Sequence, residues 1–312
     1  MTRVVTFEPG IRSLGPAVVA IGVFDGVHLG HQALVSDAVA MAKDAGVSSV
    51  VLTFDRDPDR VVIPDRAAPQ LLELEDKVRW LSDLRPDAVL IVPFDRSLAA
   101  MTPEVFIAEV LLKAMDPVTV AVGHDFCFGT AASGNVDTLS SAGLVHGFKV
   151  HAHELLHVGG GPVTSTRIRR LLAEGDVRSA ADLLGRRHFV SGAVVHGRGE
   201  GHALGVPTAN IAVHSWTALP ADGVYAAVAR VGGEYRACAV SVGLAPTFPA
   251  ATARLEVHII DYDGPELYGT RLSVEFVSRI RGQVRFDSGD ELTARVREDI
   301  QIARRTIEDS CL

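Results

Sequence analysis

The sequence predicts an α/β domain with a parallel sheet, followed by a domain with an antiparallel barrel or sandwich. Up to about residue 186, short apolar runs alternate with longer helical patterns, which is the rhythm of βαβ units. Beyond that point the chain shows short alternating strands separated by turn signals. A length of 312 residues suits about two domains. We therefore predict domains at residues 1–186 and 187–312.

In the first half, short apolar runs alternate with longer helical patterns. The expected strands are Val18–Val23, Ser48–Phe54, Ala88–Pro93, Val118–Val122 and Lys149–His153. The expected helices are Gln32–Ala45, Asp76–Leu84, Pro103–Met115 and a pair of short ones over Thr164–Leu184. Strands linked through helices run parallel, so both faces of this sheet are expected to be covered.

In the second half the periodicity changes to that of strands. The expected strands are Phe189–His196, Gly223–Val231, Tyr235–Val242, Leu255–Ile260 and Thr270–Arg279, with turn signals at Gly232-Gly233, Pro246 and Asp263-Gly264. A last helix is expected over Asp290–Ile307. This succession predicts an antiparallel β domain closed by one helix.

Composition and charge narrow the classes of function. A formal net charge of −8 and a pI near 5.8 disfavour a broad nucleic-acid surface, because a polyanion is bound by basic residues. Neither an export signal nor an apolar stretch long enough to span a bilayer is evident. Cys127, Cys238 and Cys311 are far apart and form no CxxC pair. We expect a cytoplasmic protein without nucleic-acid or membrane partners, and the oligomeric state stays open.

The most informative stretch is GVFDGVHLGH, Gly22–His31, which joins an apolar run to a helical pattern. It is typical of a strand, a glycine-rich turn and a helix start, where backbone N–H groups and the helix dipole hold an anion. His28 and His31 add two imidazoles that can hydrogen-bond or carry a proton to a phosphate. The pattern is neither a P-loop nor a GxGxxG fingerprint. Simple helix capping by a histidine is the structural alternative.

Four further segments follow expected strand ends or helix starts, where open parallel sheets bind ligands. They are Thr53-Phe54-Asp55, Gly123-His124-Asp125-Phe126, Phe128-Gly129 and Thr164-Ser165-Thr166-Arg167. Hydroxyl groups at a helix start followed by Arg167 form a second candidate anion clamp, and Asp125 could face a ribose or an amine. The alternatives are capping by Ser165 and Thr166, and a turn role for Asp55.

In the second half the strongest signal is HGRGEGHALGVPTANI, His196–Ile211. Alternating glycines permit close backbone approach to a phosphate, and they are Gly197, Gly199 and Gly201. Thr208 and Asn210 lie two residues apart on one strand face, and their oxygens suit a magnesium ion carried by a nucleotide. The alternative is a glycine-rich turn followed by two polar strand residues.

The segment Leu255–Ile259 alternates so that Glu256 and His258 share one face. If this face looks into the mouth of a barrel, Glu256 is a candidate general base for a hydroxyl nucleophile. A solvated strand face is the alternative. The residues alone do not bring Glu256 near the strand that carries Asn210.

Taken in order, the motifs resemble those of the prokaryotic bifunctional riboflavin kinase/FMN adenylyltransferases, the FAD synthetases. The strings that carry the resemblance are GVFDGVHLGH, VLTFD, VGHDFCFG, TSTRIR, EGDVRSAADLLGR, LGVPTANI, ADGVYAA, APTF, LEVHIID and LYG. They extend over nearly the whole chain. The resemblance implies an N-terminal nucleotidyltransferase domain of Rossmann-like α/β fold and a C-terminal riboflavin kinase domain built on a six-stranded antiparallel barrel.

The resemblance also implies substrates and site residues. Riboflavin would be phosphorylated to FMN, and FMN adenylylated to FAD with release of pyrophosphate, both with ATP and Mg²⁺. His28 and His31 would contact ATP phosphates, and Glu256 would accept the proton of the riboflavin 5′-hydroxyl. Thr208 and Asn210 would bind the Mg²⁺–ATP of the kinase step. The remaining nucleotide-binding positions would be Gly22, Phe24, Gly26, Gly30, Asp125, Ser165, Thr166, Arg167, Gly197, Gly199, Gly201 and Pro207.

Some positions depart from the family pattern. Arg56-Asp57-Pro58 stands where Pro-His-Pro is usual, and an acid there would repel a triphosphate. The departures in the kinase half are His202, Ala245 and Gln283. Three hypotheses stay open: a bifunctional enzyme, the same scaffold with one activity lost or with an altered flavin or nucleotide, and a flavin- or nucleotide-binding regulator without turnover. Of the two activities, Asp57 puts adenylylation more in question.

Overall fold

The structure, a computed structural model, describes residues 1–197, 206–243 and 255–310. It contains two compact units, Met1–Ser165 and Thr166–Leu312. The first unit is built on a six-stranded parallel sheet and the second on a closed antiparallel barrel. This pair of architectures confirms the fold class predicted from the sequence.

The division between the units differs from the boundary predicted at residue 186. The difference concerns two helices, α8 (Ser165–Glu174) and α9 (Val177–Leu184). The chain around them is tied to the barrel unit, since the N–H of Ala221 donates to the carbonyl of Leu172 at 2.8 Å. Compactness therefore groups these helices with the barrel, and residue 186 as the border between two activities stays a prediction.

The parallel sheet of the first unit has the strand order β1-β4-β3-β2-β5-β6. Its strands are β1 (Arg3–Thr6), β2 (Pro16–Ile21), β3 (Ser48–Phe54), β4 (Ala88–Val92), β5 (Asp116–Gly123) and β6 (Lys149–His153). The inner strands β2, β3 and β4 are mostly apolar and almost wholly buried because both of their faces are covered, whereas β5 is buried mainly toward its carboxyl end. Strand β1, which the sequence analysis missed, lies at an edge and is mostly exposed.

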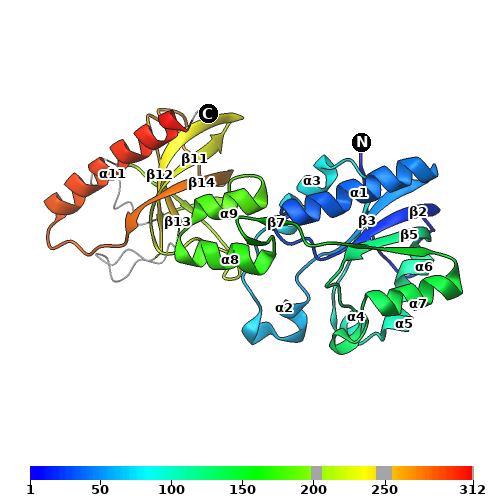
Figure 1. Cartoon of the computed structure of the whole chain (residues 1–312). Helices are drawn as coiled ribbons and strands as arrows, with labels where there is room; N and C mark the ends of the chain where they lie inside the picture. Colours follow the sequence, from blue (N-terminus) through cyan, green and yellow to red (C-terminus); the bar gives the residue numbers. More distant parts are fainter. Residues whose placement is uncertain (198–205, 244–254, 311–312) are drawn as a thin grey trace. The chain divides into compact units, whose positions relative to one another are not determined.

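Helices cover both faces of this sheet, with α1 and α3 on one side and α5, α6 and α7 on the other (Figure 1). Their bounds are α1 (Leu29–Ala45), α2 (Asp59–Val62), α3 (Leu74–Asp83), α4 (Arg96–Ala99), α5 (Pro103–Phe106), α6 (Leu112–Ala114) and α7 (Val136–His146). A π-helical turn over Ile107–Leu111 joins α5 to α6. Short 3-10 turns occupy Pro64–Arg66 and Thr130–Ala132, and a hairpin is formed by β7 (His157–Val158) and β8 (Gly161–Pro162).

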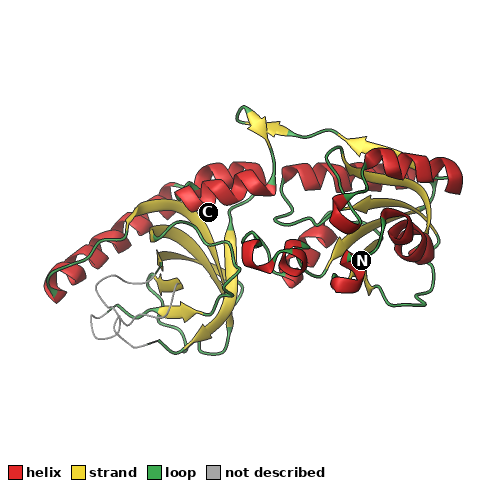
Figure 2. Ribbon diagram, turned by 90° about the horizontal axis from the view of Figure 1, so that it is seen from below, coloured by secondary structure: helices red, strands yellow, loops and turns green. Residues whose placement is uncertain are grey.

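The barrel of the second unit closes in the order β10-β13-β12-β11-β14-β9. Its strands are β9 (Phe189–Val195), β10 (Ala209–Ile211), β11 (Gly223–Val231), β12 (Glu234–Val242), β13 (Leu255–Ile259) and β14 (Arg271–Gly282). Helix α11 (Gly289–Asp309) runs along the outside of these strands (Figure 2). Ala303 and Ile307 of α11 pack on Ala226, Val228 and Ala239, so the helix buries an apolar stripe of the outer wall.

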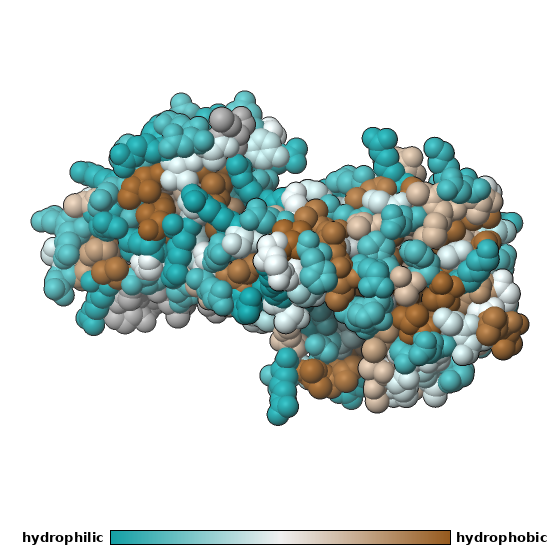
Figure 3. All heavy atoms as spheres, viewed as in Figure 1, coloured by the Kyte–Doolittle hydropathy of each residue, from teal (hydrophilic) through white to brown (hydrophobic). Residues whose placement is uncertain are grey.

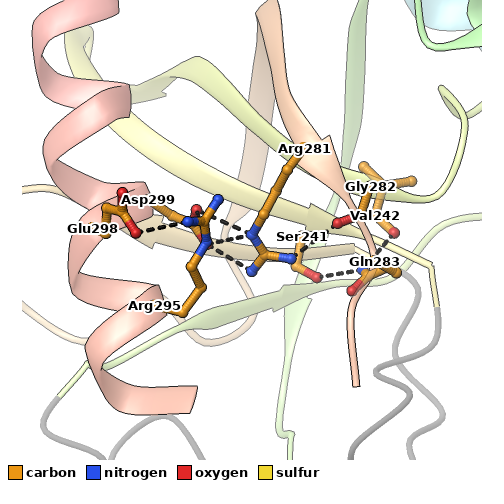
Figure 4. A network of polar contacts seen from close by, with 8 residues as sticks. All are labelled: Ser241, Val242, Arg281, Gly282, Gln283, Arg295, Glu298 and Asp299. Atoms are coloured by element: carbon orange, nitrogen blue, oxygen red, sulfur yellow. Dashed lines mark hydrogen bonds and ion pairs between the residues drawn. The ribbon is translucent and has the colours of Figure 1, made fainter. Parts of the chain in front are cut away.

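A network of polar contacts fixes α11 to the end of β14 (Figure 4). The guanidinium of Arg281 donates to both carboxylate oxygens of Asp299, at distances from 2.7 to 3.1 Å. Arg295 lies one helical turn before Asp299, 3.5 Å from its carboxylate, and also pairs with Glu298 at 2.7 Å. Because Asp299 is buried, its two arginine partners offset the cost of removing the carboxylate from water.

Polar side chains predominate on the face of the molecule drawn in Figure 3, and apolar ones lie there in small groups. Within the described part of the chain, no helix has the length and apolar character that a bilayer crossing requires. Leu144 and Val145 at the end of α7 are apolar side chains that lie on the surface, with exposed fractions of 90% and 79%.

Candidate functional sites

The sheet order of the first unit brings the sequence-predicted motifs to one edge. Strands β2 and β5 are neighbours, although β3 and β4 come between them in the sequence. Open parallel sheets bind ligands at such a switch point, beyond the carboxyl ends of the strands. The turn Gly22–His31 follows β2 directly, and the segments containing Asp55 and Asp125 follow β3 and β5. The topology thus places these three loops side by side.

The turn after β2 has an unusual backbone. Phe24 and Val27 have φ angles of 54° and 40°, in the left-handed region that side chains rarely adopt, and Gly26 has a φ of 83°. Each such non-glycine residue costs on the order of 1–3 kcal/mol and persists only where the surroundings hold it. The carboxylate of Asp25 supplies one such restraint, because it accepts hydrogen bonds from the N–H groups of Leu71 and Leu72 at 3.0 and 3.2 Å.

The two histidines of the turn form one stacked pair. Their ring centroids are 3.6 Å apart with an interplanar angle of 16°. Nδ1 of His28 accepts the N–H of His31 at 3.3 Å, so His28 caps α1 and in its neutral form carries the proton on Nε2. The first turn of α1 holds no acidic residue that would offset the positive end of the helix dipole. Capping and anion binding are therefore compatible roles for His28.

Glycines of the turn let the two rings and the chain approach closely. A Cβ on Gly30 would lie 3.4 Å from the His28 ring, and one on Gly22 would lie 3.0 Å from the Phe24 ring. The edge of Phe24 in turn meets His31, with ring centroids 5.2 Å apart. Gly22, Phe24, Gly26 and Gly30 thus shape the turn itself, and their contact with a nucleotide stays a prediction.

Ser165 belongs to the first unit and reaches this turn. Its hydroxyl donates to the carbonyl of Asp25 at 2.8 Å, which ties this residue, the first of α8 and the last of the first unit, to the backbone of the turn. Thr166 and Arg167 follow in the first turn of the same helix. A pure capping role for Ser165 does not describe this contact, which joins two of the sequence-predicted segments.

The other strand-end acids differ in their surroundings. Asp125 is exposed and its carboxylate folds over Gly123, where a Cβ would lie 3.0 Å from Oδ1. Asp55 accepts the N–H of Phe94 at 2.8 Å and pairs with Arg56 at 2.7 Å. Partial burial acts to raise the pKa of Asp55, but the hydrogen bonds from Arg56 and Phe94 outweigh it and the pKa is lowered. Asp55 therefore has the structural role that the turn alternative describes.

Asp57, the acid that departs from the family pattern, lies two residues before the short helix α2. Its Oδ1 accepts the N–H of Asp59 at 3.0 Å. Its charge also faces a cation, because Asp57 is one of three carboxylates that interact electrostatically with the buried Lys77. The repulsion expected between Asp57 and a triphosphate is thus partly offset within the unit.

Lys77 is a residue that the sequence analysis missed. It lies on α3 and is only 1% exposed, with its ammonium against the backbone of the turn at Val23. A signal was available, because Lys77 and Leu81 occupy the same face of an amphipathic helix, the face that packs inward. A lysine on an apolar face needs polar partners inside the protein.

In the barrel, strand register brings together residues that are far apart in the sequence. Asn210 of β10 is directly opposite Glu256 of β13, and Glu256 is directly opposite Ser241 of β12. Directly paired residues of antiparallel strands have Cβ atoms about 4.5–5.5 Å apart. Asn210, Glu256 and Ser241 therefore form a polar row across three strands.

This polar row lies on the outer wall of the barrel. Ser241 shares its face of β12 with Ala239, which packs against α11. Glu256 therefore does not look into the barrel mouth, the condition under which the sequence suggested a general base. It occupies instead the outer wall, beside the apolar stripe that α11 covers.

Gly197 and Asn210 are in close contact. A Cβ on Gly197 would lie 2.0 Å from Nδ2 of Asn210, which only glycine permits. Asn210 is 7% exposed, and its Oδ1 has no hydrogen-bond partner among the residues that the structure describes. Pro207 contacts the same region through its carbonyl, 2.9 Å from Nδ1 of His258, and Thr208 is half-buried. Gly199 and Gly201 lie outside the described residues.

Of the departures in the second unit, only Gln283 lies within the described residues, since His202 and Ala245 do not. Its amide nitrogen donates to Oγ of Ser241 at 3.1 Å and to the carbonyl of Val242 at 2.9 Å (Figure 4). A carboxylate has no proton to donate at neutral pH, so a glutamate would lose the bond to the Val242 carbonyl and could only accept a bond from the Ser241 hydroxyl. Gln283 thus extends the polar row of Asn210, Glu256 and Ser241.

Comparison with known proteins identifies the family. A family model described as FAD synthetase matches residues 11–167, and one described as riboflavin kinase matches residues 184–307. The bifunctional riboflavin kinase/FMN adenylyltransferase of Escherichia coli (strain K12) is 36% identical over 301 residues, covering 95% of this chain and 96% of the relative. The chain belongs to this family.

Other members and a solved structure agree over the same length. The bifunctional riboflavin kinase/FMN adenylyltransferase of Bacillus subtilis (strain 168) is 33% identical over 298 residues, covering 93% of this chain and 92% of the relative. A crystal structure titled as a macrolide-efflux protein from Streptococcus pneumoniae is 30% identical, with a TM-score of 0.84. That match covers 96% of this chain and 98% of the other.

Proposed function

We propose that the chain converts riboflavin to FMN in its second unit and FMN to FAD in its first unit, with ATP as co-substrate of both reactions. The observation that carries this proposal is the presence of both family matches in one chain. Each of the two units has its own group of candidate residues, at the strand ends of the parallel sheet in the first and on the barrel strands in the second. The bifunctional relatives match over nearly their whole length, so neither half is missing.

In the adenylyl-transfer reaction, a phosphate oxygen of FMN attacks the α-phosphorus of ATP and pyrophosphate leaves. The attacking phosphate has no proton to lose at neutral pH, so the chemistry needs positioning and charge stabilisation more than a base. Nε2–H of His28, the ring of His31 and the N-terminus of α1 are the donors suited to this task. Gly22, Gly26 and Gly30 would allow close approach of the phosphates.

In the kinase reaction, the 5′-hydroxyl of riboflavin attacks the γ-phosphorus of ATP and ADP leaves. The hydroxyl must lose its proton, and Glu256 is the candidate acceptor. Its support is the strand pairing that puts Glu256 opposite Asn210, which is itself in close contact with Gly197. Gly199, Gly201 and Pro207 complete the proposed nucleotide contacts.

Magnesium is proposed for both reactions, and residues of the second unit suit it. Oδ1 of Asn210 is a buried oxygen that has no hydrogen-bond partner among the described residues. Mg²⁺ prefers oxygen ligands and is usually held by few protein groups together with the phosphates of a substrate. Asn210 and the hydroxyl of Thr208 would hold the ion, which when bound would neutralise charge on the transferred phosphoryl group.

The proposed partners are small molecules only, namely ATP and the flavins. A cytoplasmic location and the expected lack of nucleic-acid or membrane partners stay predictions. So do the roles of Asp125, Thr166 and Arg167 in holding ATP, whose support is their position at strand and helix ends.

Product analysis tests the proposal directly. The purified protein is incubated with riboflavin, ATP and Mg²⁺, and riboflavin, FMN and FAD are separated by chromatography. We expect FMN and then FAD to appear. FMN without FAD would mean that adenylylation is lost, and binding of flavin without either product would indicate a regulator.

A further inference from the structure

The ammonium of Lys77 binds the backbone at the ends of two neighbouring strands. Nζ donates to the carbonyl of Val23, just after β2, at 3.1 Å, and to the carbonyl of Phe54, the last residue of β3, at 2.6 Å. The hydroxyl of Thr53 donates to the same Val23 carbonyl at 3.1 Å. Lys77 is 1% exposed and Thr53 is fully buried. One buried side chain from α3 thus connects the chain at the ends of β2 and β3.

The carbonyls of Val23 and Phe54 belong to peptide groups in the loops that follow β2 and β3. The Val23 carbonyl belongs to the peptide group of Phe24, whose φ angle is 54°. The Phe54 carbonyl belongs to the peptide group of Asp55, which follows β3. The orientation of a peptide group sets the direction of the chain that follows it. Lys77 therefore acts on a peptide group near the start of each loop, at the third residue of the turn that follows β2 and at the first residue after β3.

The charge of Lys77 is balanced within the protein. Burial lowers the pKa of this lysine to about 8, against the opposing effect of Asp25, Asp57 and Asp55. An ammonium with no such partners would be far more costly to bury. Three carboxylates and two carbonyls make the site suited to a cation.

We infer that Lys77 is a positioning residue for adenylyl transfer, which holds the Gly22–His31 turn in place relative to the end of β3. This inference rests on the proposed function of the first unit. The turn stores strain at Phe24 and Val27, so it needs restraints on both sides. Asp25 provides one through the Leu71 and Leu72 amides, and Lys77 provides the other. Displacement of about 1 Å at a reacting group is enough to cost about 100-fold in rate.

The test uses Lys77→Met, which keeps length and apolar packing but removes the donor. With supplied FMN, ATP and Mg²⁺, we expect kcat of FAD formation to fall about 100-fold while KM for ATP changes less than about threefold, because the groups that contact ATP remain. Lys77→Arg, which retains a cation and several donors, is expected to recover part of the loss. A merely structural role would not give this split between kcat and KM.

Controls are available in the same chain. Riboflavin phosphorylation is measured on every variant and is expected to stay at the wild-type rate. Lys113→Met, at an exposed lysine that pairs with Glu109 on the surface, is expected to leave both activities unchanged. Thr53→Val removes only one donor to Val23 and is expected to lower kcat of FAD formation less than Lys77→Met does, with Thr53→Ser losing less still.

The outcomes separate this inference from the function it rests on. If the wild-type protein forms no FAD from FMN, the proposed function of the first unit is wrong. If the wild-type protein forms FAD and Lys77→Met does so equally well, the positioning role is wrong. If Lys77→Met unfolds the first unit, as judged by circular dichroism, the milder Thr53→Val decides: a reduced kcat in a folded protein supports the inference, and an unchanged kcat overturns it.

Discussion

In the first unit the candidate residues lie on loops that leave a parallel sheet, whereas in the second they lie on the strands of the barrel itself. The loop Gly22–His31 is held by contacts with residues outside it: its own Asp25 carboxylate accepts the N–H of Leu71, and the side chains of Lys77 and Ser165 donate to its backbone carbonyls. Asn210 and Glu256 need no such restraints, because strand pairing sets their spacing. A loop site depends on its supporting contacts, and a strand site depends on register.

The largest expected effect is a reciprocal loss of the two activities. Glu256→Gln removes the proton acceptor and is expected to lower riboflavin phosphorylation by about 100-fold or more, while FAD formation from supplied FMN continues. His28→Ala removes a donor and a helix cap. It is expected to lower FAD formation by a similar factor, while riboflavin phosphorylation continues. Both rates are measured by chromatography of the flavins.

This pair also tests the comparison of the two units. If either substitution abolished both activities in a folded protein, the division of labour between the loop site and the strand site would be wrong. Glutamine keeps the shape of Glu256, so loss of packing does not confuse the result.

Glycine substitutions are expected to have the next largest effects and to differ between the units. Gly197→Ala would put a Cβ 2.0 Å from Nδ2 of Asn210, so Asn210 must move and phosphorylation is expected to fall about 10- to 100-fold. Gly22→Ala meets only the edge of the Phe24 ring at 3.0 Å, which a small shift of the ring relieves. Its effect on FAD formation is expected to stay within about tenfold. Equal losses at the two positions would contradict this contrast.

The units also differ in the charge of a buried basic side chain, and the pH dependence of stability reports on this difference. His188 in the barrel unit is buried and its Nε2 donates to the carbonyl of Ala218 at 2.9 Å. Burial lowers the pKa of His188 to about 4, although the bond to Ala218 opposes this and Arg186 adds to it. His188 is therefore neutral at pH 7, whereas the ammonium of Lys77 keeps most of its charge there.

A depressed pKa in the folded state means that the unfolded state binds more protons between the two pKa values. The contribution of His188 to the free energy of unfolding is thus complete above pH 6.5 and is lost as the pH falls to about 4, by about 3 kcal/mol at most. The measurement is urea unfolding of a Trp80→Phe variant, in which Trp216 reports on the barrel unit alone. His188→Gln keeps a donor for Ala218 and should flatten the pH dependence; an unchanged slope would contradict the assignment.

The smallest expected effect concerns Asp57. Since its charge is partly offset by Lys77, removing it with Asp57→Asn is expected to lower KM for ATP in FAD formation by no more than about fivefold. The amide oxygen of asparagine can still accept the N–H of Asp59. An increase of 100-fold in adenylylation would show instead that Asp57 suppresses this activity in the wild-type protein. Salt dependence of KM provides an independent check on the electrostatic origin.

Much of the fold followed from local patterns. Apolar runs bounded by polar residues predicted β3, β4 and β5, and helical periodicity predicted α1 and α3 close to their observed bounds. Strand β1 escaped because four residues at a sheet edge, mostly exposed, lack a continuous apolar run. The predicted border at residue 186 differed from the compact units because amphipathic patterns show that α8 and α9 are helices, but not which unit they contact.

The sequence by itself determined the two architectures and the motifs at the strand ends, because apolar periodicity and turn chemistry are local properties. Only the tertiary structure decided that Asn210 is opposite Glu256, that this pair lies on the outer wall, and that His28 stacks on His31. Strand register and ring packing depend on residues far apart in the chain. The role of Lys77 was invisible for the same reason: a lysine reveals its function only when the fold surrounds it with carbonyls and carboxylates.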